Sequence, residues 1–133
     1  KVTHIENNSE KLADYLVKNI DTKEVTFFCG DKRMDDLPTT LLNNDFIVNE
    51  VVCYQTQLTP RKIEDKYKGI LFYSPSGVES YLKENTANEI VAFCIGETTA
   101  KKAEDHFKNV VVSKLSTVES VIKSVNDYFQ VAE

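Results

Sequence analysis

The sequence of 133 residues has no tryptophan, few histidines and cysteines, and no long apolar run. A transmembrane helix needs about 20 consecutive apolar residues, and no stretch of this sequence approaches that length. The first residues, KVTHIENNSE, also lack the apolar segment of a secretory signal peptide. These absences argue against a membrane span or a signal peptide in this sequence. Because it starts at Lys1 rather than at methionine, we expect that further residues precede it.

Basic residues are outnumbered by acidic ones. The sequence has 16 lysines and arginines against 21 aspartates and glutamates, a formal net charge of −5 at pH 7, and no basic tract. Domains that bind nucleic acid usually carry a clustered basic surface that contacts phosphates. We therefore expect neither nucleic acid nor a membrane among the partners.

Cysteine and histidine are too few and too far apart in the sequence to indicate a zinc site, a disulfide or a catalytic triad. Cys29, Cys53 and Cys94 lie inside apolar runs and show no C-x-x-C spacing. Structural zinc sites need closely spaced ligand pairs, and disulfides belong to oxidising compartments. We expect three buried free thiols in a reducing cytoplasm. His4 and His106 have no evident partner, so we predict neither a metal site nor a Ser-His-Asp hydrolase.

Strand and helix patterns alternate along the whole chain. Short apolar runs such as ILFY and IVAFCI are followed by longer amphipathic segments. This alternation favours βαβ units and a largely parallel sheet covered by helices on both faces, so the predicted fold class is α/β. Parallel strands are expected near residues 25–29, 70–74, 90–95 and 109–113.

The remaining expected elements follow from caps and apolar stripes. We predict a strand at 1–5 and an extended segment around 45–59. Helices are expected over 10–19, around 37–42, over 60–67 after Thr59-Pro60, over 76–83, over 98–107 and from Thr117 onward. The last helix has an apolar stripe of Val118, Val121, Ile122, Val125 and Phe129.

Three turns of small or polar residues follow predicted strands, at 30–33, 74–77 and 96–99. In an open parallel sheet, ligands bind beyond the carboxyl ends of the strands, where the next helices begin. Each turn offers backbone N–H groups at a helix N-terminus, and two add hydroxyl groups, which suits an anion. The alternative is ordinary helix capping, in which Ser76 and Thr98 act without any ligand.

Other motifs of known chemistry are missing. The S-P-S-G turn lacks the first glycine of the G-x-S-x-G nucleophile elbow, and neither a Walker A loop nor G-x-G-x-x-G occurs.

Tyr54 is a candidate proton donor. It follows Val51, Val52 and Cys53 and precedes a polar run. A phenol has a reference pKa of about 10 and therefore keeps its proton at neutral pH. The alternative is a tyrosine that packs at a sheet edge.

Five segments in this order resemble the C-terminal half of the uroporphyrinogen-III synthase family: FFCGDKRMDDLP, VVCYQT, LFYSPSGVESYL, CIGETTAKKA and STVESVIKSV. The resemblance covers almost the whole chain. It implies two flavodoxin-like α/β domains joined by an extended two-stranded connector, with the active site between them. Family members cyclise hydroxymethylbilane to uroporphyrinogen III with inversion of ring D and loss of water. They use no metal or organic cofactor and hold the eight substrate carboxylates largely by backbone amides.

The resemblance also assigns residues and domains. Tyr54 matches the tyrosine proposed to assist departure of the hydroxyl group, and Glu97 departs from the pattern by adding a negative charge. Residues 1–52 would finish one domain, 53–58 would form the connector and 59–133 most of the other domain. This part alone is expected to be inactive, and the complete enzyme monomeric. The expected substrate-binding residues come from the turns at 74–77 and 96–99, to which the turn at 30–33 is added. They are Ser74, Ser76, Gly77, Gly96, Thr98, Thr99, Gly30 and Arg33.

A second interpretation is a non-catalytic flavodoxin-like module that binds an anion or a nucleotide. A receiver domain of this kind would need an acidic cluster with an aspartate at a strand end, and only Asp31 comes near.

Overall fold

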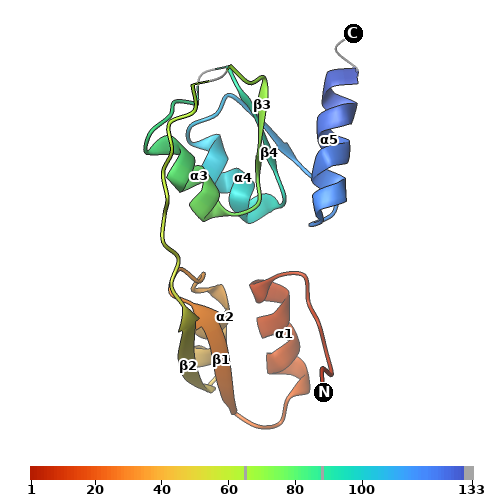
Figure 1. Cartoon of the computed structure of the whole chain (residues 1–133). Coiled ribbons are helices and arrows are strands. Elements are labelled where there is room, and N and C mark those ends of the chain that lie inside the picture. Colours follow the sequence, from red (N-terminus) through yellow and green to blue (C-terminus); the bar gives the residue numbers. More distant parts are fainter. Residues whose placement is uncertain (65, 88, 131–133) are drawn as a thin grey trace. The chain divides into compact units, whose positions relative to one another are not determined.

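The chain divides into two units, Lys1–Thr56 and Gln57–Glu133, each built from parallel strands and helices (Figure 1). The computed structural model describes residues 1–64, 66–87 and 89–130. The predicted α/β class is confirmed. None of the helices in these ranges is long and apolar enough to cross a membrane.

The first unit is a strand pair with two helices. Its elements are α1 (Ser9–Asn19), β1 (Glu24–Gly30), α2 (Asp36–Leu42) and β2 (Ile47–Tyr54). Strands β1 and β2 are parallel. Helix α1 begins where predicted, because the Asn8 side chain accepts a hydrogen bond from the Lys11 N–H at 2.9 Å. Pro38 lies in the first turn of α2, where its missing N–H costs nothing.

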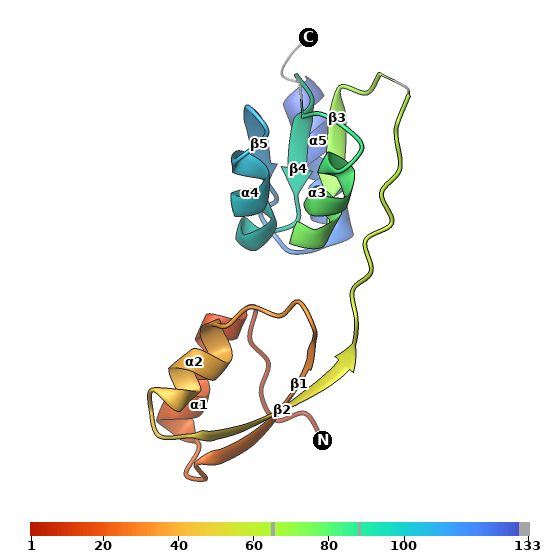
Figure 2. The same ribbon diagram turned by 90° about the vertical axis from the view of Figure 1, so that its left-hand side faces the viewer.

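Both helices of this unit pack on the same face of the strand pair (Figure 2). The core on this face consists of Ala13, Leu37, Leu41 and Phe46, with Val25, Phe27 and Val48 of the strands packed against it. Phe28, Ile47 and Val51 alternate with these strand residues and are exposed, Phe28 to 68%. In the described residues of this unit, helices therefore cover one face, whereas helices on both faces were expected.

The second unit is a three-stranded parallel sheet in the order β3-β4-β5. Its elements are β3 (Gly69–Phe72), α3 (Pro75–Leu82), β4 (Val91–Cys94), α4 (Glu97–Glu104), β5 (Asn109–Val112) and α5 (Val118–Gln130). All four residues of the central strand β4 are buried, as its continuous apolar character predicts. The four strands predicted from apolar runs are found within a few residues of their expected positions.

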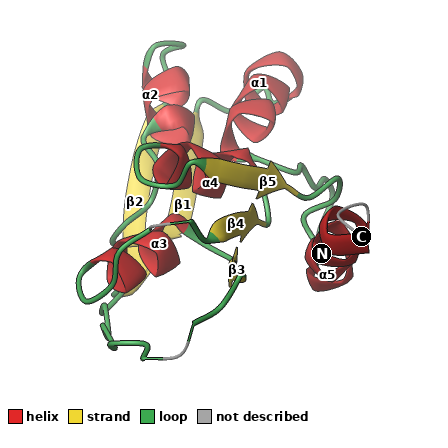
Figure 3. Cartoon of the chain, turned by 90° about the horizontal axis from the view of Figure 1, so that it is seen from above, coloured by secondary structure: helices red, strands yellow, loops and turns green. Residues whose placement is uncertain are grey.

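Helices cover both faces of this sheet. Helices α3 and α4 pack on one face over Phe72, Ala92 and Cys94, and α5 packs on the other over Val91 and Phe93. Figure 3 shows α5 on the opposite side of β3, β4 and β5 from α3 and α4. This unit has the layered arrangement that the sequence predicts.

The strand predicted at residues 1–5 is not formed. The His4 ring stacks on Tyr15 of α1 with ring centroids 3.4 Å apart, and its Nε2 lies 2.8 Å from a Glu6 carboxylate oxygen. The segment is thus held against a helix rather than in a sheet. The expectation that His4 has no partner is also wrong.

The helix predicted after Thr59-Pro60 is absent from the described residues of that stretch; Asp65 lies outside them. A single short helix is marginal in water unless an apolar face packs against the rest of the protein. Ile63 is 42% exposed, so this segment lacks such a face. A favourable cap and a proline at the first position are not sufficient here.

Cysteine burial differs from the prediction at one position. Cys29 and Cys94 are buried, but Cys53 is exposed. Burial, with a smaller contribution from the negative charge of Glu104, raises the pKa of Cys94 to about 11. Cys94 is therefore a neutral core thiol at physiological pH and not a nucleophile.

The burial of α5 gives a test of the sheet's second face. Val121 is fully buried, whereas Val118, one turn earlier on the same helix, is 50% exposed. Val121→Ala should lower the free energy of unfolding by about 1–3 kcal/mol more than Val118→Ala, because it leaves a cavity in the core. Both changes replace valine by alanine on the same helix, so the larger part of their difference reports packing. Equal losses in chemical denaturation would contradict the packing of α5.

The cysteines give a second test. A thiol-reactive aromatic disulfide should modify Cys53 quickly in the native protein, because thiolate access controls the rate. Cys29 and Cys94 should react only after addition of denaturant. Fast reaction of all three thiols in the native protein would contradict the described cores.

Candidate functional site

The turns after β3 and β4 lie at the same edge of the second unit's sheet. Strands β3 and β4 are parallel neighbours, with Phe72 opposite Cys94 near their carboxyl ends. Ser74 and Gly96 each follow one of these strands and open the next helix. The structure thus brings together two of the three turns that the sequence singled out, at the edge where α/β sheets bind ligands.

The Ser74 turn is a capped helix start. The Ser74 hydroxyl accepts a hydrogen bond from the Gly77 N–H at 3.1 Å and lies 3.0 Å from the Ser76 hydroxyl. Helix α3 starts at Pro75, so the cap is Ser74 and not Ser76 as expected. The chain's own serine therefore already satisfies the Gly77 N–H. A Cβ at Gly77 would meet only ordinary contacts, 3.5 Å from Ser74 Oγ.

The Gly96 turn is different because no side chain caps helix α4. Gly96 occupies the cap position in an extended conformation, so the expectation that Thr98 is the cap is wrong. Glycine has no side-chain oxygen to cap the helix, and its carbonyl oxygen accepts only the Thr99 N–H at 3.1 Å and the Ala100 N–H at 3.0 Å. The N–H groups of Glu97 and Thr98 are therefore left without an acceptor among the described residues. Glu97 and Thr98 are exposed in the first turn, whereas Thr99 is only 3% exposed. The open N-terminus of α4 can accept an anion at its backbone.

The turn after β5, at residues 113–117, lies at the same edge and is not among the three turns that the sequence pattern pointed to. Strand β5 is parallel to β4, and the residues after it include Ser113 and Ser116. The Ser113 hydroxyl donates to the carbonyl oxygens of Ile95 (2.9 Å) and Leu115 (2.8 Å) as alternative acceptors. A Cβ at Gly96 would lie 3.6 Å from Ser116 Oγ. The signal for this turn is the hydroxyl-rich S-K-L-S-T that follows NVVV.

Tyr54 and Gly30 meet in the first unit. Gly30 pairs with Tyr54 at the carboxyl ends of β1 and β2, and the Tyr54 side chain is 64% exposed. The Asp31 N–H donates to the Tyr54 carbonyl oxygen at 3.1 Å. The predicted proton donor thus lies at the end of a parallel sheet, beside the predicted first turn. Cys53 and Tyr54 belong to β2, so two residues of the predicted connector 53–58 are part of a strand.

Arg33, predicted to bind substrate, is already paired with two carboxylates. Its guanidinium donates to Glu50 of β2 through Nε at 2.7 Å and Nη2 at 2.8 Å, and it also contacts Asp35. The hydrogen bonds to Glu50, and to a smaller extent the one to Asp35, raise the pKa of Arg33. The pairing ties the turn after β1 to β2 and offsets the positive charge of Arg33.

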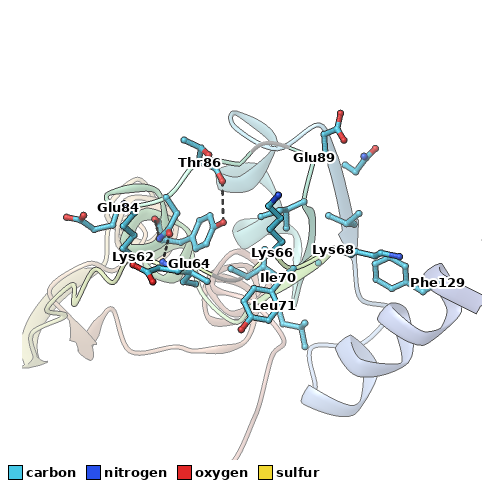
Figure 4. Close-up of a pocket in the computed structure, with 18 of the residues that line it drawn as sticks. Lys62, Glu64, Lys66, Lys68, Ile70, Leu71, Glu84, Thr86, Glu89 and Phe129 are labelled. Carbon is cyan, nitrogen blue, oxygen red and sulfur yellow. Dashed lines mark hydrogen bonds between the residues drawn. The ribbon is translucent and has the colours of Figure 1, made fainter.

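The second unit also has a hollow of about 1210 Å³ (Figure 4), at the opposite end of the sheet from the turns. Its lining includes the first residues of three strands, Gly69, Val91 and Asn109. Charged residues of both signs surround it: Lys62, Lys66, Lys68, Glu64, Glu84 and Glu89. Mixed charge gives no preference for an anion, and neither Ser74 nor Gly96 contributes. The size of this hollow therefore does not make it the candidate site.

In the part of the chain that the structure describes, no group of three or more histidine, cysteine, aspartate and glutamate side chains is placed to hold an ion.

Comparison with known proteins identifies a family and a similar solved structure. The family model described as uroporphyrinogen-III synthase HemD matches residues 1–123. Among solved structures, the chain is similar to the crystal structure of uroporphyrinogen-III synthetase from Helicobacter pylori 26695, with a TM-score of 0.70 and 18% identity. The alignment covers 88% of this chain and 59% of that chain, so the chain spans less than two thirds of its length. No curated protein matches.

Proposed function

Because the chain belongs to the uroporphyrinogen-III synthase family, we propose that it forms part of an enzyme that cyclises hydroxymethylbilane to uroporphyrinogen III. The reaction inverts ring D and releases water. The observation that carries the proposal is the uncapped N-terminus of α4 beside the Ser74 turn at one sheet edge. A substrate with several carboxylates requires such anion sites.

The proposed carboxylate site is built from backbone rather than from charged side chains. The N–H groups at the start of α4 point beyond the sheet edge, and the helix dipole adds a partial positive charge there. Glycine at position 96 leaves room for a ligand to approach this backbone. The hydroxyl groups of Ser74, Ser76 and Thr98 add donors, and Gly77 keeps the neighbouring turn open. Thr99 supports the turn from inside the core.

In the first unit, Tyr54 is the proposed general acid. Loss of hydroxide from the substrate needs a proton donor near the breaking bond, and an exposed phenol at a sheet end can supply it. Arg33 joins the substrate only if a substrate carboxylate replaces Glu50 or Asp35 as its partner. No metal or organic cofactor takes part in this proposal.

The complete enzyme is proposed to contain further chain that finishes both domains. The exposed apolar face formed by Phe28, Ile47 and Val51 supports this, since a parallel pair normally has both faces covered. Under the same proposal the complete enzyme is a cytoplasmic monomer, with no nucleic acid or membrane partner, and this part alone is inactive.

Tyr54→Phe in the complete enzyme tests the catalytic role. The change keeps the ring and removes only the proton. Turnover should fall about 10²–10⁴-fold, which corresponds to about 3–5 kcal/mol of lost transition-state stabilisation. Substrate binding should stay within a few-fold, and uroporphyrinogen I should increase because the unconsumed substrate cyclises without the enzyme. The measurement is the ratio of type III to type I porphyrin after oxidation.

Tyr128→Phe is the matched control. Tyr128 lies on α5 and lines the hollow, which is at the end of the second unit's sheet opposite to the Ser74 and Gly96 turns. This variant should keep the parental isomer ratio. If Tyr54→Phe keeps the parental ratio of type III to type I porphyrin at limiting enzyme, the role of Tyr54 is structural and not catalytic.

Glu97→Pro tests the backbone site at α4. Proline fits the first position of a helix, the preceding Gly96 is extended, and α3 already carries Pro75 at that position. The change removes one N–H donor and one negative charge, whereas the control Glu97→Ala removes only the charge. We expect product affinity, measured by anaerobic calorimetry, to be about 10–100-fold weaker for Glu97→Pro than for Glu97→Ala, because a hydrogen bond to an ionised group is lost.

Equal affinities of these two variants would exclude this N–H as a ligand. A bulky residue at position 99 would not serve as a test, since Thr99 is buried and its replacement would disturb the core.

A further inference from the structure

The end of β2 contains a bulge that changes the direction of Tyr54. From Glu24 opposite Ile47 to Cys29 opposite Val52, the two strands pair one residue with one. The next pair is Gly30 with Tyr54, so Cys53 is an extra residue in β2. β-Bulges of this kind redirect the side chains that follow them and are frequent next to active sites.

Without the bulge, Tyr54 would face the helices of its unit. Side chains alternate along a strand, and Val48 packs in the helix-covered core, so position 54 shares that face in a regular strand. The bulge instead aligns Tyr54 with Gly30, whose alternation places it on the face of Phe28. That face carries no helix in the described residues of this unit. The phenol therefore becomes available to a ligand instead of entering the core.

Gly30 provides the surface on which the phenol end of Tyr54 rests. A Cβ built on Gly30 would lie 2.6 Å from both Cε2 and Cζ of Tyr54 and 2.8 Å from its Oη. These distances are well inside van der Waals contact, so any side chain at position 30 excludes the ring from this place. The atoms concerned include the hydroxyl oxygen, which is the reacting end of the proposed acid.

The backbone on both sides of this contact is fixed by hydrogen bonds. The Asp31 N–H donates to the Tyr54 carbonyl oxygen at 3.1 Å, and the Asp31 carboxylate accepts the Thr56 N–H at 2.8 Å. Because the backbone of Tyr54 is held while its ring is largely exposed, contact with Gly30 is what selects the ring position.

We propose that Gly30 is a positioning residue that, with the bulge at Cys53, sets the orientation of the Tyr54 phenol for proton donation. This inference rests on the proposed function of Tyr54, and it assigns to Gly30 a role that acts through the tyrosine rather than on the substrate. A catalytic group displaced by about 1 Å can lose about 10²-fold in rate, so the absence of a single methyl group is sufficient to matter.

A double-mutant cycle in the complete enzyme tests the coupling. Gly30→Ala alone should lower kcat about 10²-fold, with KM within a few-fold, and shift the product toward type I. In the Tyr54→Phe background, Gly30→Ala should have no further effect on kcat, because no proton donor remains to be misplaced. An equal loss in both backgrounds would overturn the inference.

A spectroscopic test does not depend on activity. Fluorine NMR of the enzyme labelled with 3-fluorotyrosine should show the Tyr54 resonance, identified by its loss in Tyr54→Phe. Gly30→Ala should shift this resonance and leave those of the other tyrosines in place. The control is Gly69→Ala, whose Cβ would lie 2.8 Å from Phe93 in the second unit and which should leave the Tyr54 resonance unmoved. An unmoved Tyr54 resonance in Gly30→Ala would contradict the contact.

The two tests also separate this inference from the proposed function. A shifted resonance together with parental activity of Tyr54→Phe would preserve the contact but remove its catalytic purpose, and so overturn both the proposed acid and the role of Gly30 in catalysis.

A folding control covers the case in which Gly30→Ala alone does not fold. The double variant Gly30→Ala with Tyr54→Ala should then fold as well as Tyr54→Ala, because the clashing ring is gone. Failure of that pair would place the need for glycine in the backbone and overturn the inference.

Discussion

Parallel pairing of neighbouring strands is the constraint on which the candidate site depends. In a parallel sheet every strand ends at the same edge, so the turns after β3, β4 and β5 must collect there, whatever their sequences. Small and hydroxyl residues in those turns then form one surface at one sheet edge. The same rule, applied to β1 and β2, places Tyr54 beside the turn that starts at Gly30.

Within that common edge, the two main turns differ in one chemical respect. Ser74 accepts the Gly77 N–H with its hydroxyl as well as its carbonyl oxygen, whereas Gly96 accepts the Thr99 N–H with its carbonyl oxygen alone. The N–H groups of Glu97 and Thr98 in α4 are left for an external acceptor. An isolated cap needs no ligand, so the Ser74 turn alone would indicate only helix stability. The contrast between the two turns supports the proposed ligand site at the start of α4.

The sequence predicts the features that depend on local pattern and misses those that depend on pairing partners. The strands β4 and β1 follow from continuous or aromatic apolar runs, and α1 follows from its Asn8 cap. The segment after Thr59-Pro60 has good helix signals but no core to pack on, which only the folded chain reveals. The bulge at Cys53 is set by register with β1, a long-range property, and it explains why an apolar-looking Cys53 is exposed and where Tyr54 points.

Long-range charge and local geometry would act differently on a bound polyanion in each of the two units. The net charge of −5 repels a polyanion at a distance, but salt screens exposed charges beyond about 8 Å at physiological ionic strength. Arg33 of the first turn is already paired with Glu50 and Asp35. The proposed contacts rest instead on the backbone: in the second unit on the N–H groups at the start of α4, and in the first unit on the glycine under the Tyr54 ring. Under the proposed function, the missing side chains at Gly96 and Gly30 therefore carry more weight than the charged ones. Gly96 has no side chain to stand between a ligand and the start of α4, and at Gly30 the phenol occupies the place of a Cβ.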